Sequence, residues 1–335
     1  MADKNGGHKL LRSAGRESTL SYIRRIMSQK SDIVLVYLFL FILMAVTQVL
    51  NSKFLTFYNL RNLMASTLPY LFIALAQMTV ILLGGIDLSV GAMISVTVSV
   101  CAVSMGDGPM GWVPGVLAAI ALGACMGFIN GVVVVKGRLQ AIVATLATSS
   151  IYGGVAYLIL PTPGGYINPE FAKLLTGYAK GLKVIPFVIF IVVVVLMWVF
   201  LTRTKLGRDI YATGGNAEAA YASGIKVERV KIVAFVVCGI ISALCGIYVA
   251  ARTQSGDPAI GNTFTNYSIA CAVIGGTALA GGRGTPIGTV AGVLIIVVVN
   301  NMLNLLRVES YYQYLMLGLM MVVALTLSAI RTRGK

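Results

Sequence analysis

Ten long stretches of this sequence contain no Asp, Glu, Lys or Arg, and they restrict the fold more than any other feature. Each has at least 19 residues, and a helix of about 20 residues crosses the roughly 30 Å hydrocarbon layer of a bilayer. Only 11% of the chain is charged, whereas soluble domains have about 25% charged residues. The stretches predict an all-α, polytopic integral membrane protein with about ten transmembrane helices, at residues 33–52, 62–86, 88–106, 108–135, 139–169, 184–202, 232–251, 258–282, 284–306 and 310–330.

Two of these stretches, 62–86 and 88–106, are separated only by Asp87, which follows Gly84-Gly85-Ile86. Glycine adopts positive φ without steric cost, so the helix is expected to unwind at this point. Irregular backbone is tolerated at membrane depth where protein surrounds it. We therefore expect some of the helices to be discontinuous.

The positions of Lys and Arg predict the orientation, because short loops rich in these residues stay in the cytoplasm. With a cytoplasmic N-terminus, 19 of the 26 Lys and Arg residues fall on the cytoplasmic side. Both the N- and C-termini are therefore expected in the cytoplasm, and the net charge of +15 largely reflects this asymmetry. The predicted organisation is a basic cytoplasmic leader at 1–32, a transmembrane domain at 33–330 with a cytoplasmic loop at 203–231, and a cytoplasmic tail at 331–335.

The chain lacks the residue patterns that common enzyme and metal sites need. Its only histidine, His8, lies in the leader, which excludes a Ser-His-Asp or Cys-His arrangement and a histidine metal site. The five cysteines lie in apolar stretches without the spacing of metal ligands. No Gly-x-x-x-x-Gly-Lys-Ser/Thr phosphate loop is present, so any ATP would be hydrolysed by another subunit. We expect no catalytic residue, metal or cofactor in this chain, and its scattered basic residues do not indicate nucleic-acid binding.

Two segments 197 residues apart share a pattern of a span, a Gly-Gly turn, five residues and a glycine, which indicates either parallel repeats or shared composition. The glycines expected to shape a pathway are Gly84, Gly85 and Gly91 in the first segment and Gly281, Gly282 and Gly288 in the second. Asp87 and Ser89 are expected to cap the helix after the first turn, and Thr285 the helix after the second. For Asp87, a direct role in transport and a packing or assembly contact stay open.

Uncharged polar residues within the apolar stretches have two interpretations. Their amides and hydroxyls can bond between helices, or they can line a route for a solute rich in hydroxyl groups. The residues in question are Gln77, Gln140, Thr145, Asn300 and Asn304.

The loop at 203–231 carries the signals of a short helix. Asn216 is a good N-cap, Glu218 would lie in the first turn where an acid favours the helix dipole, and Gly224 can end the helix. The alanine-rich sequence between them has high helix propensity. We predict a helix of about two turns outside the membrane, which is either an ordinary loop helix or an element that docks in a groove on another protein.

Glu218-Ala219-Ala220, followed after three residues by Gly224, resembles the EAA motif of the membrane subunits of bacterial ATP-binding cassette (ABC) importers. The chain also resembles the ribose, xylose and galactose type of permease over nearly its whole length, and looks most like ribose-type permeases. The segments that carry this resemblance are Gly-Gly-Ile-Asp-Leu-Ser-Val-Gly at 84–91, Lys-Gly-Arg-Leu-Gln-Ala at 136–141, Ala-Thr-Leu at 144–146, Thr-Lys-Leu-Gly-Arg at 204–208, Gly-Gly-Asn at 214–216 and Leu-Ala-Gly-Gly-Arg-Gly at 279–284.

The resemblance implies a permease that moves a sugar across the bacterial inner membrane by alternating access. A ribose-like monosaccharide is the first candidate for this sugar. The resemblance also implies three protein partners: a cytoplasmic ATPase that binds ATP and Mg, a periplasmic sugar-binding protein, and a second permease subunit that is identical or related. In such importers a loop helix couples the permease to the ATPase. The matching residues of this chain are Gly215, Asn216, Glu218, Ala219, Ala220 and Gly224.

One segment departs from the family pattern. Thr265-Asn266-Tyr267 stands where many relatives have Glu-Leu-Asp ahead of the eighth span, which leaves open the substrate and the pairing with an identical subunit. One alternative is an ABC permease for a quorum-sensing furanone, another aldose or a polyol. The other is an ion-coupled secondary sugar carrier, which would need a buried ionisable pair.

Overall fold

A computed structural model describes residues 33–177 and 184–333, so the predicted leader at 1–32 and the end of the predicted tail lie outside the described residues. A first helix covers Ile33–Leu50. The further helices are α2 (Phe57–Ile81), α3 (Val90–Ser104), α4 (Val113–Lys136), α5 (Ala141–Ile159), α6 (Pro169–Thr176), α7 (Val184–Arg203), α8 (Lys205–Gly215), α9 (Ala217–Ala222), α10 (Val227–Thr253), the 3-10 helix η1 (Ile260–Thr263), α11 (Phe264–Ile274), α12 (Pro286–Leu305) and α13 (Ser310–Arg333).

Each of the ten uncharged stretches contains a helix, which confirms the all-α polytopic fold. In the described part of the chain, seven helices are long and apolar enough to cross a membrane: Ile33–Leu50, α2, α4, α5, α7, α10 and α12. The total number of spans stays a prediction. The short helices α6, α8 and α9 lie between the stretches or at their edges.

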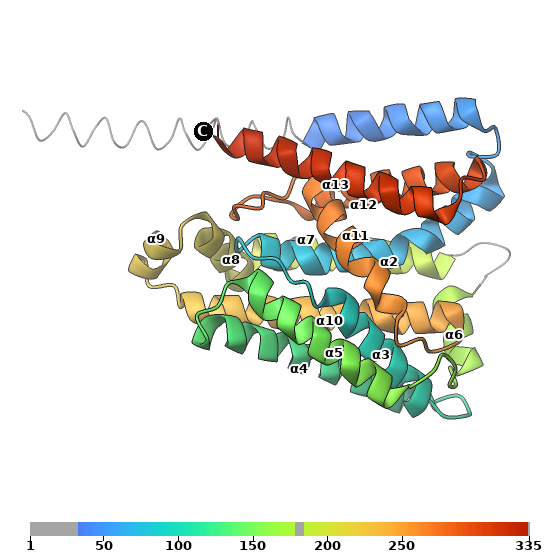
Figure 1. Ribbon diagram of the computed structural model, residues 1–335, viewed down its shortest axis with the longest axis horizontal. Helices are drawn as coiled ribbons and strands as arrows, with labels where there is room; N and C mark the ends of the chain where they lie inside the picture. Colours follow the sequence, from blue (N-terminus) through green and yellow to red (C-terminus); the bar gives the residue numbers. More distant parts are fainter. Residues whose placement is uncertain (1–32, 178–183, 334–335) are drawn as a thin grey trace, which may run out of the picture.

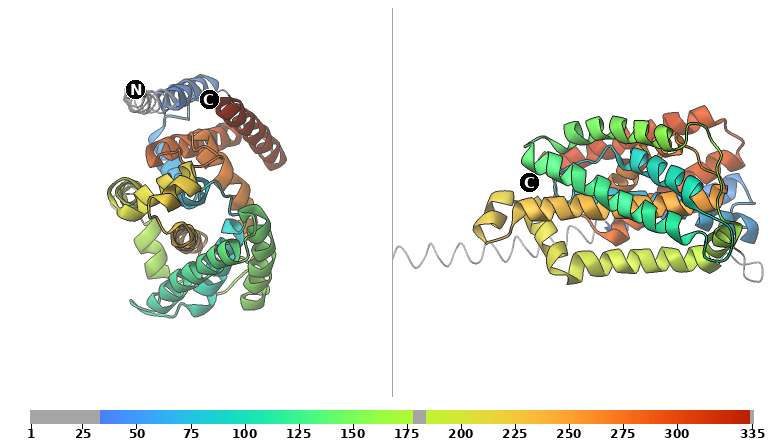
Figure 2. Two further views of the ribbon diagram at one scale, coloured as in Figure 1. Left: turned by 90° about the vertical axis from the view of Figure 1, so that its left-hand side faces the viewer. Right: turned by 90° about the horizontal axis from the view of Figure 1, so that it is seen from below.

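The helices surround a core formed mainly by α2, α3, α10 and α12. In the most apolar 18 residues of each helix, 83% of α2 is buried but only 17% of α7. This difference places α2 at the centre and α7 at the periphery. The Ile33–Leu50 helix and α13 lie on one flank of the molecule, and α4 and α5 lie on the opposite flank (Figures 1 and 2). Large exposed apolar side chains on the peripheral helices suit a hydrocarbon environment.

Small residues allow α4 and α10 to pack at close range. A Cβ added to Gly127 would lie only 2.9 Å from the carbonyl carbon of Phe235, and a Cβ on Gly131 only 2.8 Å from the Cα of Ile232. On the other side of the contact, a Cβ on Gly239 would lie 3.0 Å from the nitrogen of Gly127. These glycines therefore bring the two backbones into contact, as is common between membrane helices.

Two connections are unwound within the protein, as the glycine pattern predicts. The first turn, residues 82–89, joins α2 to α3, and the second turn, residues 275–285, joins α11 to α12. Gly84 in the first turn has φ +76°, and Gly281 and Gly282 in the second have φ +85° and +68°. Residues with a Cβ rarely adopt such angles. The prediction of discontinuous helices is therefore confirmed.

The first and last described helices run in opposite directions. In Figure 1 the Ile33–Leu50 helix runs away from the end that carries α8 and α9, and α13 runs back toward that end. The assignment of this end to the cytoplasm rests on the distribution of Lys and Arg and stays a prediction.

Candidate functional site

Helix α9 forms a short projection between α7 and α10 (Figure 1). The side-chain Oδ1 of Asn216 accepts the N–H of Ala219 at 2.9 Å and so caps the helix. At the other end Gly224 has φ +83°, and the N–H of Ile225 donates to the Ala220 carbonyl at 3.1 Å. The start and end signals read from Asn216 and Gly224 are thus confirmed, with a helix of six residues.

The outer face of α9 is open to solvent. Of its six residues only Ala220 is buried, and Glu218 lies exposed in the first turn. Tyr221 is 75% exposed, although tyrosine normally buries much of its ring. Exposed aromatic residues on a protruding element are typical anchors of protein interfaces.

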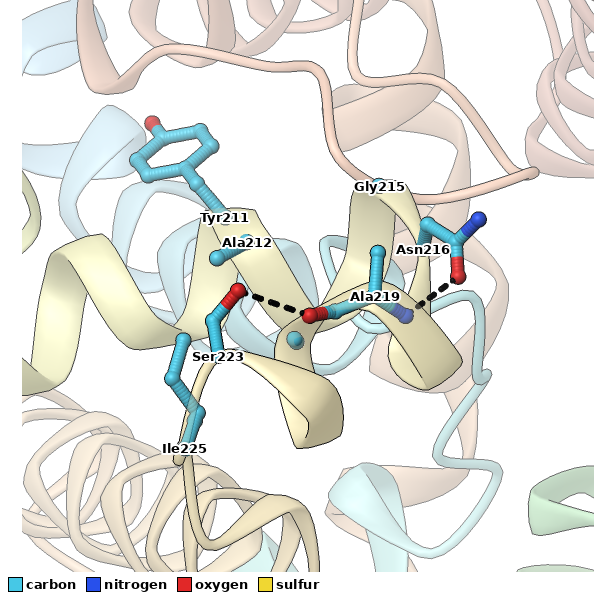
Figure 3. Close-up of a pocket in the computed structure, with 8 residues that line it drawn as sticks. Tyr211, Ala212, Gly215, Asn216, Ala219, Ser223 and Ile225 are labelled. Carbon is cyan, nitrogen blue, oxygen red and sulfur yellow. Dashed lines mark hydrogen bonds between the residues drawn. The ribbon is translucent and has the colours of Figure 1, made fainter.

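A shallow hollow of about 360 Å³ lies between α8 and α9 (Figure 3). It is lined by Tyr211, Ala212, Gly215, Asn216, Ala219, Ala220, Ser223 and Ile225. The hollow thus gathers four of the six predicted coupling residues, whereas Glu218 and Gly224 lie outside its lining. The hydroxyl of Ser223 donates to the Ala219 carbonyl at 2.9 Å and stabilises the last turn of α9.

The first turn is held by the buried carboxylate of Asp87. Its Oδ1 accepts the N–H of Ser89 at 2.8 Å and the Ser89 hydroxyl at 2.7 Å. The predicted cap by Ser89 is wrong, because the Ser89 side chain makes no cap bond to α3 and points to Asp87 instead. The predicted cap by Asp87 is wrong as well, because its carboxylate accepts the N–H and hydroxyl of Ser89, the residue before α3, and so organises the turn that precedes the helix.

Asp87 also ties the first turn to distant helices. The Asn130 amide on α4 donates to Asp87 Oδ2 at 3.2 Å and to the Ser89 hydroxyl at 2.7 Å. The Tyr152 hydroxyl on α5 donates to Asn130 Oδ1 at 3.1 Å. The Gln77 side chain bonds to the backbone of Asp87 when its amide is oriented to satisfy both its oxygen and its nitrogen. The amide oxygen then accepts the N–H of Asp87 at 3.2 Å, and the amide nitrogen donates to the Asp87 carbonyl at 3.1 Å. The buried carboxylate is thereby satisfied by neutral donors.

The second turn lies against the first. The N–H of Gly282 donates to the carbonyl oxygen of Leu82 at 2.8 Å. Thr285 caps α12, because its Oγ1 accepts the N–H of Gly288 at 3.0 Å, and this prediction is confirmed. The two Gly-Gly turns, each predicted to shape a pathway, are therefore in direct contact.

The other predicted turn glycines allow close packing next to these turns. A Cβ on Gly85 would lie 3.0 Å from Ala141 Cβ. A Cβ on Gly91 would overlap the Gly261 carbonyl, and one on Gly288 would overlap the Gly275 carbonyl. Side chains at Gly91 and Gly288 would therefore displace the neighbouring backbone.

The five candidate pathway residues fall into two groups. Gln77 and Thr145 are fully buried, and Thr145 Oγ1 accepts the N–H of Leu88 at 2.9 Å, so both hold the first turn. Gln140 is exposed at the start of α5 and makes no cap bond. Asn300 is partly exposed on α12, and Asn304 is exposed and accepts from the Gln313 amide at 2.9 Å. A solute-lining role stays a prediction for all five.

The segment that departs from the family pattern lies at the start of α11. The rings of Tyr267 and Tyr70 meet edge to face, with centroids 5.0 Å apart. These two tyrosines occupy equivalent positions of the two segments that are 197 residues apart, so the segments also touch at this level.

Some residues at these turns carry no signal in the local sequence. The partnership of Asp87 with Asn130 joins positions 43 residues apart. Tyr211 and Gly214 at the end of α8 contact the second turn, and their spacing in the sequence does not predict this contact. Within residues 33–177 and 184–333, no three His, Cys, Asp or Glu side chains form a group that could hold a metal.

Comparisons with known proteins agree on one family. Residues 59–325 match the model of the family described as branched-chain amino acid transport system / permease component. The ribose import permease protein RbsC of Escherichia coli K12 is 39% identical over 305 residues, covering 89% of this chain and 92% of the relative. RbsC of Bacillus subtilis 168 is also 39% identical, over 87% and 91% of the two chains. The D-allose permease protein AlsC of Escherichia coli K12 is 34% identical over 82% and 84%. No solved structure matches.

Proposed function

The chain belongs to the permease family whose model covers residues 59–325, and from this membership we propose that it carries a ribose-like monosaccharide, driven by a separate ATPase subunit. It is a multi-pass protein of the bacterial inner membrane and the permease subunit of a sugar ABC importer.

The observation that carries the choice of substrate is the similarity to ribose import permeases over almost the full length of both chains. Further relatives are named for D-allose, L-arabinose and galactose, which are also monosaccharides. These names do not favour a furanone, a polyol or an ion-coupled carrier. A ribose-like aldose is therefore the first substrate to test.

We assign the coupling of sugar transport to ATP hydrolysis to α9 and its flanking residues. These residues are Gly215, Asn216, Glu218, Ala219, Ala220 and Gly224. Support comes from the exposure of α9, its caps at both ends and the exposed ring of Tyr221. The partner ATPase would bind and hydrolyse ATP with Mg. Transport would alternate access between the two membrane faces as the ATPase closes and reopens.

Two further partners complete the proposal. A periplasmic sugar-binding protein would deliver the sugar, and a second permease subunit, identical or related, would complete the pathway. The two turns would shape this pathway through Gly84, Gly85, Asp87, Ser89 and Gly91 in the first segment and Gly281, Gly282 and Gly288 in the second. Weak binding within the pathway favours release of the sugar on the far side.

Replacement of Gly224 by valine tests the coupling role of α9. The φ of +83° at this position costs a residue with a Cβ roughly 1–2 kcal/mol, so valine is expected to reshape the end of α9. ATP-driven uptake of radiolabelled ribose should fall by about tenfold, which corresponds to about 1.4 kcal/mol. The measurement is initial uptake in host cells that contain only the variant permease.

Gly224→Asn is the matched control, because asparagine tolerates positive φ better than valine. It should retain most of the uptake, and both variants should reach the membrane in normal amounts, since no atom lies within 4 Å of an added Cβ. Normal ribose uptake by Gly224→Val would count against the coupling role.

A further inference from the structure

The end of α8 forms a junction with both unwound turns. A Cβ added to Gly214 would overlap the carbonyl oxygen of Leu82 in the first turn and lie 2.8 Å from the nitrogen of Gly282 in the second. A Cβ on Gly281 would lie 2.7 Å from the Gly214 carbonyl oxygen and 2.9 Å from the Gly84 nitrogen. Three backbone segments therefore meet with no space for a side chain.

Hydrogen bonds hold this junction together. The N–H of Gly282 donates to the carbonyl of Leu82, which joins the two turns. The Tyr211 hydroxyl on α8 donates to the carbonyl of Gly284 at 2.8 Å, which joins α8 to the second turn. Burial raises the pKa of Tyr211 to about 12, so its hydroxyl stays protonated and remains a donor near neutral pH.

Helix α8 is closely linked to α9. Asn216 ends α8, where its N–H donates to the Ala212 carbonyl at 3.1 Å, and its side chain caps α9. One residue thus belongs to both helix ends, and the Tyr211 ring points away from α9 (Figure 3). A force applied to the outer face of α9 can therefore reach the junction through Asn216 and the packed α8–α9 contact.

We propose that Gly214 and Tyr211 are positioning residues that transmit a displacement of α9 to both turns at once. This inference rests on the proposed function, because it takes the displacement to come from the ATPase subunit. The first turn leads into α3 and the second into α12, so one movement of α8 repositions the starts of both helices. The glycines allow the contact to be made by backbone, which is stiffer than contact through flexible side chains.

The test measures ribose uptake and ATP hydrolysis in the same proteoliposomes, which contain the full complex with its ATPase and the sugar-binding protein. A loss of folded complex would lower both rates equally and leave their ratio unchanged. A transmission defect lowers the ratio of sugar transported to ATP hydrolysed. This ratio therefore separates transmission from a structural role.

For Gly214→Ala we expect the ratio to fall by about tenfold, because the added methyl group must displace the Leu82 carbonyl. Tyr211→Phe removes only the hydroxyl and should lower the ratio by roughly two- to tenfold, the range expected from one hydrogen bond. Gly154→Ala is the control, since Gly154 lies in α5 with no atom within 4 Å of its added Cβ. It should retain the wild-type ratio.

Wild-type ratios in both Gly214→Ala and Tyr211→Phe, with the ATPase still bound, would overturn the transmission proposal and leave the proposed function intact. Absence of ATP-driven ribose uptake by the wild-type complex would overturn the proposed function, and the transmission proposal with it. If Gly214→Ala does not assemble, Tyr211→Phe decides the question alone.

Discussion

Replacement of Asp87 by alanine should remove most of the folded permease from the membrane, rather than lower transport alone. The fully buried carboxylate accepts bonds from the Ser89 N–H, the Ser89 hydroxyl and the Asn130 amide. A buried donor that loses its acceptor costs about 1–3 kcal/mol, so the expected loss is several kcal/mol. Native proteins have a total stability of only about 5–15 kcal/mol.

The measurement is the apparent unfolding temperature of the purified permease in detergent. Asp87→Ala should lower it by roughly 10 °C or more, and Asp87→Asn should lie in between because it keeps one acceptor oxygen. Asp107→Ala, at an exposed acid in the α3–α4 loop, is the control and should resemble wild type. A wild-type unfolding temperature for Asp87→Ala combined with abolished uptake would instead indicate a direct transport role for Asp87.

Replacement of Gly127 by leucine should separate α4 from α10 and prevent stable folding. A Cβ on Gly127 would already overlap the Phe235 carbonyl oxygen and lie 3.0 Å from the Cα of Val236. Backbone atoms cannot move aside as side chains can, so the helices must separate over the whole contact. We expect a destabilisation of about 3 kcal/mol or more, at the upper end for overpacking.

The yield of monodisperse protein after size-exclusion chromatography measures this effect. Gly154→Leu is the matched control, because it places the same side chain on an exposed position of α5 with open space around it. The control should give wild-type yield, and Gly127→Leu should give mostly aggregate. Equal yields of both variants would show that the α4–α10 contact is not required for folding.

The helices could be predicted from the sequence because uncharged stretches of at least 19 residues suit the bilayer core. Their ends were less accurate, because capping and not charge determines where a helix begins. Helix α2 begins at Phe57 behind the Thr56 cap and so includes Arg61, which lies outside the uncharged stretch. Helix α11 covers only 11 residues of its stretch because the chain turns at Gly276, with φ +87°.

In the candidate site, features set by neighbouring residues could be predicted from the sequence, and contacts between distant residues could not. Helix α9 could be predicted because Asn216 and Gly224 act on neighbouring residues. The cap predicted for Ser89 failed because Asp87, two residues earlier, takes its hydroxyl. The contacts of Asp87 with Asn130 and of Tyr211 with Gly284 depend on how helices pack. No periodicity or cap signal encodes such contacts between distant positions.

We propose that an ATPase subunit docks on α9, and Glu218→Arg tests this docking most directly. The substitution reverses a charge on the exposed first turn of α9 and places a cation at the positive end of the helix dipole. The matched control is Glu170→Arg, because Glu170 occupies the same position of another short helix, α6, two residues after the capping Asn168.

The measurement is ATP hydrolysis by tagged permease purified in detergent from its native host. We predict that ATPase activity co-purifies with the wild-type chain and with Glu170→Arg, and that most of it is lost with Glu218→Arg at equal permease yield. Undiminished ATPase activity with Glu218→Arg, or an equal loss with Glu170→Arg, would contradict docking on α9.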